Sequence, residues 1–257
     1  QMDNMTLDDV FSNTVVQDQD PIKNQITQSI YYDGYGFYPN FDMNVVNHYQ
    51  FNSSLGGDIL YYGDYLEPSE NPLTIVSGWN WIGFCPPYPL DVNAATASLS
   101  LQDQDYIKNN LFSAIYYDGY GWYPAFTMQP TEGYMLDIVN SGTLIYPDES
   151  LSENNEIILS RSFNDDVWYL DRHFYEYNAS IVLDIDIENT EVSENDQIGA
   201  FYGNECRGIG FADLCPITDE YVFNTMIYSN TENEVITFKY YNAETGETYP
   251  VENTYVF

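Results

Sequence analysis

Residues 17–43, QDQDPIKNQITQSIYYDGYGFYPNFDM, recur 85 positions later at residues 102–128 as QDQDYIKNNLFSAIYYDGYGWYPAFTM. The two stretches are identical at 18 of 27 positions. An internal repeat at this level predicts that the chain is built from copies of one module. Repetition multiplies a displayed surface, whereas a catalytic pocket rarely needs a second copy, so the repeat favours binding or assembly over catalysis.

The repeat divides the chain into three predicted segments: a first copy (1–63), a second copy (64–148) and a segment without evident repeat (149–257). The second copy contains an apolar strand candidate, LTIVSGWNWIGF (73–84), whose counterpart in the first copy falls ahead of residue 1. The first copy is therefore predicted to lack its opening strand. Either processing removed that strand, or another element, such as a strand from a neighbouring molecule, fills the open sheet edge.

All three segments carry the signals of β structure. Short runs rich in Tyr, Ile, Val and Phe alternate with turns such as Asp118-Gly119, while 7–11 and 103–111 are predicted as short helices. Residues 149–257 alternate in polarity as a β-sandwich does, in SIVLDIDI (180–187), QIGAFY (197–202), YVFNTMIY (221–228), EVITFKYYN (234–242) and ETYPVENTYVF (247–257). The predicted fold is mostly β, with two tandem small β-rich modules, the first lacking its opening strand, followed by a β-sandwich.

The chain is strongly acidic, with 40 Asp and Glu residues against six Lys and Arg and a formal net charge of -34. Nucleic acid is excluded as a partner because its phosphates require several cationic contacts, and an anionic membrane surface is disfavoured for the same reason. The sequence contains no run of 18 apolar residues, so membrane insertion is not expected. At the ionic strength of seawater such charge is screened within a few ångströms, so an extracellular, saline location is expected.

Sequence motifs for catalysis are not evident, and the chain is not expected to be an enzyme. Its two histidines, His48 and His173, lie in different segments, no G-x-S-x-G motif surrounds a serine, and no phosphate-binding glycine motif precedes a predicted helix. Forty acidic residues produce many accidental carboxylate pairs, so such pairs give no useful signal for glycoside hydrolysis. Cys206 and Cys215 bracket CRGIGFADLC, which predicts either a small disulfide loop or buried free thiols.

The strongest candidate for binding is the aromatic repeat YYDGYG-[FW]-YP. Its rings can stack on sugars or anchor a protein interface, or alternate rings can fill the module core and form cross-strand pairs. Because strand side chains alternate between faces, about half of the rings are expected inside. The candidate residues are Tyr31, Tyr32, Tyr35, Phe37, Tyr38, Tyr116, Tyr117, Tyr120, Trp122 and Tyr123.

Calcium is the candidate cofactor. Asp18 and Asp20, repeated as Asp103 and Asp105, provide carboxylate oxygens of the kind that calcium prefers, as does the acidic run 184–196. The spacing does not match an EF-hand. Capping of loops by the aspartates is the alternative interpretation.

The order GWNWIGF, QDQDYIKNN, GYGWYPAF, EGYMLDI and GTLIYP resembles modules found repeatedly in large secreted and cell-surface proteins of Bacteroidota-type bacteria. The stretch ENDQIGAFYGNECRGIG, followed by ITFKYYNAETGETYPV, resembles a β-sandwich module that often accompanies them. Together the resemblances cover nearly the whole chain. They imply an extracellular accessory architecture and no catalytic residues.

These observations lead to one favoured function and two alternatives. The favoured one is a structural or adhesive subunit of an extracellular homopolymer or surface layer, joined by strand addition and tyrosine contacts. The first alternative is a module that binds polysaccharide through its Tyr and Trp turns. The second is a secreted hydrolase, which requires a deep cleft lined by two carboxylates with perturbed pKa values.

Overall fold

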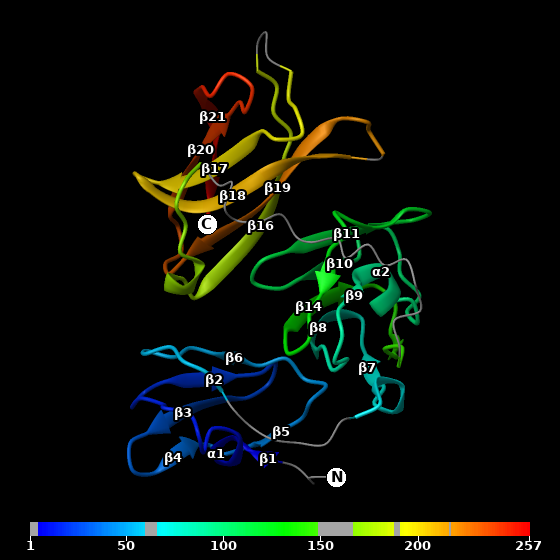
Figure 1. The fold of residues 1–257 in the computed structure, drawn as a ribbon, viewed down its shortest axis with the longest axis vertical. Coiled ribbons are helices and arrows are strands. Elements are labelled where there is room, and N and C mark those ends of the chain that lie inside the picture. The colour runs from blue at the N-terminus through cyan, green and yellow to red at the C-terminus, as the bar shows by residue number, and fades with distance from the viewer. Residues whose placement is uncertain (1–4, 60–65, 149–166, 188–190, 216) are drawn as a thin grey trace. The chain divides into compact units, whose positions relative to one another are not determined.

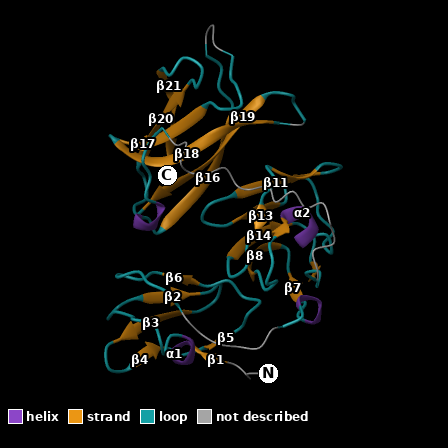
Figure 2. Ribbon diagram, in the orientation of Figure 1, coloured by secondary structure: helices purple, strands orange, loops and turns teal. Residues whose placement is uncertain are grey.

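The structure is a computed structural model that describes residues 5–59, 66–148, 167–187, 191–215 and 217–257 (Figure 1). It is mostly β, with helical segments of no more than four residues among those described (Figure 2). The elements of the repeats are β1 (Met5–Thr6), α1 (Leu7–Val10), β2 (Pro21–Lys23), β3 (Gln28–Tyr32), β4 (Gly36–Tyr38), β5 (Asp42–Met43), β6 (Gln50–Phe51), η1 (Pro68–Glu70), β7 (Leu73–Ile75), β8 (Gly78–Gly83), β9 (Leu90–Asp91), α2 (Val92–Ala95), β10 (Tyr106–Lys108), β11 (Ser113–Tyr117), β12 (Gly121–Tyr123), β13 (Thr127–Met128), β14 (Gly133–Ile138) and β15 (Gly142–Leu144).

The C-terminal elements are η3 (Arg172–Phe174), β16 (Tyr177–Leu183), β17 (Gln197–Tyr202), β18 (Glu205–Leu214), β19 (Tyr221–Ser229), β20 (Val235–Tyr241) and β21 (Thr248–Val256). The chain forms two compact units: residues 1–109 with 114–159, and residues 110–113 with 160–257. Both copies of the repeat lie in the first unit, except for residues 110–113 of the second copy.

The two copies of the repeat fold in the same way, element by element, at the 85-residue offset. Strands β2, β3 and β4 correspond to β10, β11 and β12, and helix α1 corresponds to α2. Each helix fixes the following hairpin through its second residue, because Asp8 Oδ1 accepts from the Phe37 amide and Asn93 Oδ1 accepts from the Trp122 amide, both at 2.8 Å. Sequence identity in the hairpins therefore reflects a shared three-dimensional module.

The sheets of the two modules differ by one strand. The second module has five strands in the order β12-β11-β10-β14-β8, whereas the first has four in the order β4-β3-β2-β6. Strand β6 corresponds to β14, and the position of β8 beside it has no strand among the described residues. The predicted lack of an opening strand in the first copy stays a prediction.

The C-terminal part is β-rich, as predicted. Its described strands form one curled antiparallel sheet in the order β16-β19-β18-β17-β20-β21. One face packs around Ile198, Phe223, Phe238 and Tyr240. A second apolar cluster is formed by side chains of β17 and β18. It consists of Phe201, Cys206 and Ile209, with Trp168 and Leu170 packed against them.

Two local predictions have opposite outcomes. Residues 7–10 form helix α1, which is capped by Thr6 and Asp9. In contrast, the helix predicted over 103–111 is wrong, because this stretch contains strand β10. Ile107 is fully buried in that strand, and its neighbours Tyr106 and Lys108 pair with β14. Pairing with a distant strand outweighs the weak local preference for a helix.

Candidate interaction surface

Several apolar side chains of the first module are only partly buried, and we call four of them the open face: Phe41, Met43, Tyr49 and Phe51. Their counterparts in the second module are almost completely buried: Phe126 (5% exposed), Met128 (0%), Tyr134 (0%) and Leu136 (0%). Every one of the four pairs differs in the same direction. The open face is therefore a core surface that lacks part of its cover.

The internal geometry of the open face matches that of its buried counterpart. The Phe41 and Tyr49 rings are stacked with centroids 6.2 Å apart, and the Phe126 and Tyr134 rings are stacked at 5.9 Å. The Tyr49 hydroxyl accepts from the Asn44 amide at 2.8 Å, as the Tyr134 hydroxyl accepts from the Gln129 amide at 2.9 Å. The open face is thus arranged for burial without being fully buried.

In the second module, β8 and the following residue, Phe84, cover the buried counterparts of the open face. Strand β8 is antiparallel to β14, with Ile82 opposite Tyr134 and Asn80 opposite Leu136. Ile82 is 1% exposed, and Phe84 (3%) lies edge-on to the Tyr134 ring at 6.4 Å. Strand β8 therefore pairs with β14 through its backbone, and its inward-facing side chains cover the apolar face of the module.

In the first module the corresponding edge is strand β6, where backbone N–H and C=O groups point away from the sheet. Strand β6 pairs with β2 through Ile22 opposite Phe51 and Lys23 opposite Gln50, and the Asn52 amide donates to the Pro21 carbonyl at 3.1 Å. Hydrogen-bonding direction alternates along an antiparallel strand, so the Phe51 N–H and C=O point away from β2. Its counterpart Leu136 faces β8 in this way.

The outer edge of β8 is covered by the first module. The Gln25 side chain donates to the Trp79 carbonyl at 2.7 Å and accepts from the Trp81 amide at 2.9 Å. Farther along, the Gly83 amide donates to the Val46 carbonyl at 2.8 Å. The two modules are thus joined by hydrogen bonds to the edge of β8.

Two glycines make this joint possible. A Cβ on Gly83 would lie 2.7 Å from the carbonyl oxygens of Val45 and Asn47, which are backbone atoms and cannot rotate away. A Cβ on Gly133 would lie 2.4 Å from the His48 ring. Close approach of the first module therefore requires residues without side chains at both positions.

His48 is buried in the joint between the modules. Its ring lies 5.1 Å from the Trp81 ring, and Nδ1 lies 3.3 Å from the Tyr134 carbonyl, which can only accept, so Nδ1 donates. Burial lowers the pKa of His48 from its ordinary 6.5 to about 4, although the bond to Tyr134 opposes this shift. The folded protein therefore holds His48 neutral over most of the pH range.

We expect the first unit to lose stability as the pH is lowered, because of His48. The unfolded chain takes up the proton near pH 6.5 and the folded chain only near pH 4, so stability is lost as pH falls between these values and then levels off. The loss attributable to His48 is about 2 kcal/mol from pH 7 to pH 5. Urea unfolding of the native protein and His48→Gln at pH 7, 6 and 5 checks this. Parallel pH profiles of the two proteins would contradict it.

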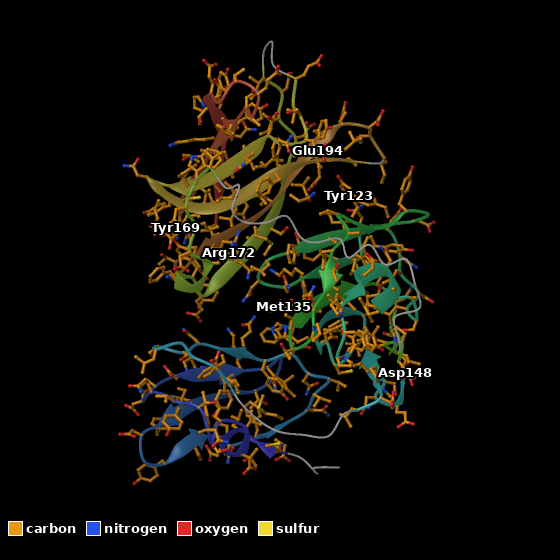
Figure 3. The ribbon with its side chains drawn as sticks, in the orientation of Figure 1. Tyr123, Met135, Asp148, Tyr169, Arg172 and Glu194 are labelled. Carbon is orange, nitrogen blue, oxygen red and sulfur yellow. The ribbon has the colours of Figure 1, made fainter. Side chains whose placement is uncertain are left out.

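The tyrosine-rich hairpin of the first module is exposed on one side. Tyr32 and Tyr38 lie on the same face of β3 and β4, with exposed fractions of 38% and 75%, and Tyr35 in the turn is 92% exposed. In the second module the turn residue Tyr120 is 63% exposed. The other tyrosines of the set, Tyr31, Tyr116, Tyr117 and Tyr123, are half-buried. Figure 3 labels Tyr123 on β12 and Met135 on β14.

Phe37 and Trp122 do not belong to a binding surface, which corrects the prediction for these two residues. Each is 3% exposed. The Trp122 indole donates to the Thr96 hydroxyl at 2.8 Å, and in the first module the Phe37 ring instead lies 5.1 Å from the Phe11 ring. They lie on the inner face because the strand alternates there, so the most promising sugar-stacking ring by residue type is a core residue.

The four aspartates proposed as calcium ligands accept hydrogen bonds within their own modules. Asp20 and Asp105 are each 1% exposed, and Asp105 accepts from the Gln102 and Val139 amides at 2.8 and 2.9 Å. Asp18 and Asp103 accept from the amides of Asp33 and Asp118 in the hairpin turns. Among the described residues no group of three His, Cys, Asp or Glu side chains has the arrangement of a metal site. Calcium binding stays a prediction.

The disulfide proposed between Cys206 and Cys215 is not formed. Residues 205–214 form one extended strand, β18, so the two cysteines lie at its opposite ends, roughly 30 Å apart for about nine residue steps. The Cys206 thiol donates to the Gly208 carbonyl at 3.4 Å. The spacing indicated a loop, whereas the alternating apolar residues between the cysteines form a central strand.

Searches of protein-family models, curated proteins and solved structures with this chain find no significant match. Within the described ranges, no helix has the length and apolar character needed to cross a membrane. The candidate surfaces are therefore interpreted from their own geometry.

Proposed function

We propose that this protein is a subunit of an extracellular homopolymer or surface layer, joined by strand addition at the first module and by tyrosine contacts. The observation that supports the proposal is the combination of a partly exposed apolar face with a strand edge, at β6, that pairs with no second strand among the residues that the structure describes. An exposed edge of this kind favours pairing with another chain. A repeated module that displays a contact surface suits head-to-tail assembly, because such contacts propagate unless a rotation closes the ring.

The acidic charge supports the extracellular setting. A net charge of -34 disfavours contact between copies at low ionic strength, and salt screening removes most of that repulsion. Assembly is therefore expected at high salt. Calcium is expected to enhance it by neutralising carboxylates, whether or not a built site exists.

Electron microscopy and sedimentation of the purified protein test the proposal. The protein is compared at low salt, at the ionic strength of seawater, and at high salt with and without calcium. Filaments, sheets or a series of oligomers at high salt are expected. A protein that is monomeric under every one of these conditions would rule out self-assembly.

The exposed tyrosines of the hairpin should contribute to assembly and not to folding. Because the Tyr35 and Tyr38 rings are 92% and 75% exposed, the double variant Tyr35→Ser/Tyr38→Ser should change the free energy of unfolding by less than about 1 kcal/mol. It should reduce assembly by about tenfold or more, as loss of anchoring aromatics does. Sedimentation and urea unfolding measure the two effects. Tyr169→Ser, at an 83% exposed tyrosine of the other unit, is the matched control and should behave as the native protein.

A glycan-binding accessory module is the second candidate, and the exposure of Tyr35 and Tyr38 beside a glycine turn favours it. Exposed flat rings of this kind can stack on sugar faces. A glycan array with the native protein and the same double variant separates the two functions. Binding to a polysaccharide that the variant loses, together with unchanged monomeric behaviour, would favour glycan recognition.

A further inference from the structure

Strand β8 is the terminal strand of the described five-stranded sheet, and the first module covers the side of β8 that faces away from β14. We infer that this cover, formed by Gln25 and Val46, is an intramolecular latch, and that a released β8 pairs with β8 of a second copy of this chain. The inference rests on the proposed self-assembly for its role. It adds to that assembly a contact that each copy holds closed.

Three residues of β8 point their backbone groups away from β14, because hydrogen-bonding direction alternates along an antiparallel strand. The first module binds each of them. The Gln25 side chain donates to the Trp79 carbonyl at 2.7 Å and accepts from the Trp81 amide at 2.9 Å. The Gly83 amide donates to the Val46 carbonyl at 2.8 Å. The latch therefore extends along the length of the strand.

The latch satisfies the edge of β8 with the same chemical groups that another strand would bring. The side-chain amide of Gln25 carries one C=O acceptor and an NH2 donor, as a peptide group carries an acceptor and a donor. Next to it, the backbone at Asn47 forms an antiparallel bridge with Ile82. Covering an edge in this way prevents it from pairing with another chain.

Gln25 lies at the surface, which makes its part of the latch easy to open. Its side chain is exposed, so water competes for both of its hydrogen bonds. The turn that presents Gln25 is fixed separately, because Asn24 Oδ1 accepts from the Ile26 and Thr27 amides at 2.9 and 2.8 Å. Release of β8 therefore requires the loss of contacts at the joint and leaves this turn folded.

The charge of β8 differs from that of the chain as a whole. Residues 73–84 contain no charged side chain, whereas the chain carries a formal net charge of -34. Proteins protect sheet edges either with charged side chains or by covering the edge. Strand β8 has only the cover, and two released copies would meet on a neutral segment, where their repulsion is weakest.

Pairing of β8 with itself satisfies both copies at once. Each copy exposes the same backbone groups, so an antiparallel pair about a twofold axis places Trp81 opposite Trp81 and Trp79 opposite Gly83. The two five-stranded sheets then continue into one another through the paired β8 strands. The partner that fits the released edge is therefore a second copy of the chain.

Two variants open the latch at separate points. Gln25→Ala removes both side-chain hydrogen bonds, and Gly83→Ala places a Cβ 2.7 Å from the carbonyl oxygens of Val45 and Asn47. Gln28→Ala, at an exposed glutamine of the same hairpin, is the matched control. Sedimentation at the ionic strength of seawater should give both latch variants a dimer dissociation constant about tenfold or more below that of the native protein and the control, since loss of two hydrogen bonds shifts opening by that order. Latch variants that dimerise no more tightly than the native protein would overturn the inference.

Hydrogen exchange identifies the surface through which the variants associate. In dilute Gln25→Ala the Trp81 amide should exchange faster than in the native protein, because its acceptor is gone. At high protein concentration the same amide should become protected again, as a second copy pairs with it. The amides of β14 should stay slow at both concentrations, which shows that the module remains folded. Dimers in which the Trp81 amide stays unprotected would place the contact elsewhere and overturn the inference.

The latch and the proposed polymer can fail separately. Dimers of the latch variants, together with a native protein that is monomeric at every salt concentration, would support the latch and overturn the polymer. Native filaments that neither latch variant strengthens would support the polymer and overturn the latch. Native assembly that both latch variants strengthen supports both.

Discussion

Glu234→Gln should destabilise the C-terminal unit by about 3 kcal/mol, because it leaves a buried guanidinium without its main counterion. Glu234 and Arg207 are 8% and 6% exposed, and the Arg207 Nη1 donates to Glu234 at 2.9 Å. The Arg207 Cζ also lies over the Tyr175 and Tyr202 rings, at 4.7 and 5.4 Å from their centroids. The chain has only six Lys and Arg residues, and Arg207 is buried within the fold.

Urea unfolding of each single variant measures the effect. Glu205→Gln is the matched control, since Glu205 also contacts Arg207, at 3.3 Å, but its side chain is 60% exposed. The control should change the free energy of unfolding by less than about 1 kcal/mol. Equal losses in the two variants would show that burial does not determine the strength of this network.

Asp105→Asn should destabilise the second module by about 2–4 kcal/mol. Both carboxylate oxygens of Asp105 accept backbone amides, from Gln102 and Val139. Asparagine has one acceptor oxygen, so its NH2 group would face a backbone N–H in a site that is 1% exposed. The first module offers an independent repeat of the experiment, because Asp20 accepts from the Gln17 and Ser54 amides at 2.9 and 3.0 Å.

Asp103→Asn is the control for this prediction and also tests calcium binding. Asp103 is exposed and accepts through one oxygen, a role that asparagine can keep. Without calcium, Asp103→Asn should cost much less than Asp105→Asn. If calcium stabilises the native protein and Asp103→Asn then becomes as damaging as Asp105→Asn, the aspartates act as metal ligands rather than as loop caps.

Much of the architecture could be predicted from the sequence because it depends on local alternation and on the repeat. Strands β17, β19, β20 and β21 lie where polar and apolar residues alternate, and each element of one copy maps onto the other. Strand β18 was missed because its two bracketing cysteines suggested a loop. The helix over 103–111 was wrong because its local preference is weak and its pairing partner, β14, is distant along the chain.

The candidate surface could be predicted only in part. The repeat predicted that the counterpart of residues 73–84 falls ahead of residue 1, and among the described residues the sheet of the first module has no strand in the position of β8. The sequence does not show that Phe41, Met43, Tyr49 and Phe51 lie together, because they meet only when β5 and β6 fold over helix α1. It also gave no signal for Gln25 and His48, whose side chains bind the edge of β8 and its neighbour β14.

The sequence by itself determined the repeat, its β character and its acidic charge, since each follows from composition, alternation and offset. Only the tertiary structure decided which aromatic rings are buried, which aspartates cap loops and which surface is left uncovered. The physical reason is that burial is a property of neighbours. Tyr49 and Tyr134 occupy equivalent positions and differ because β8 covers one of them and, among the described residues, no strand covers the other.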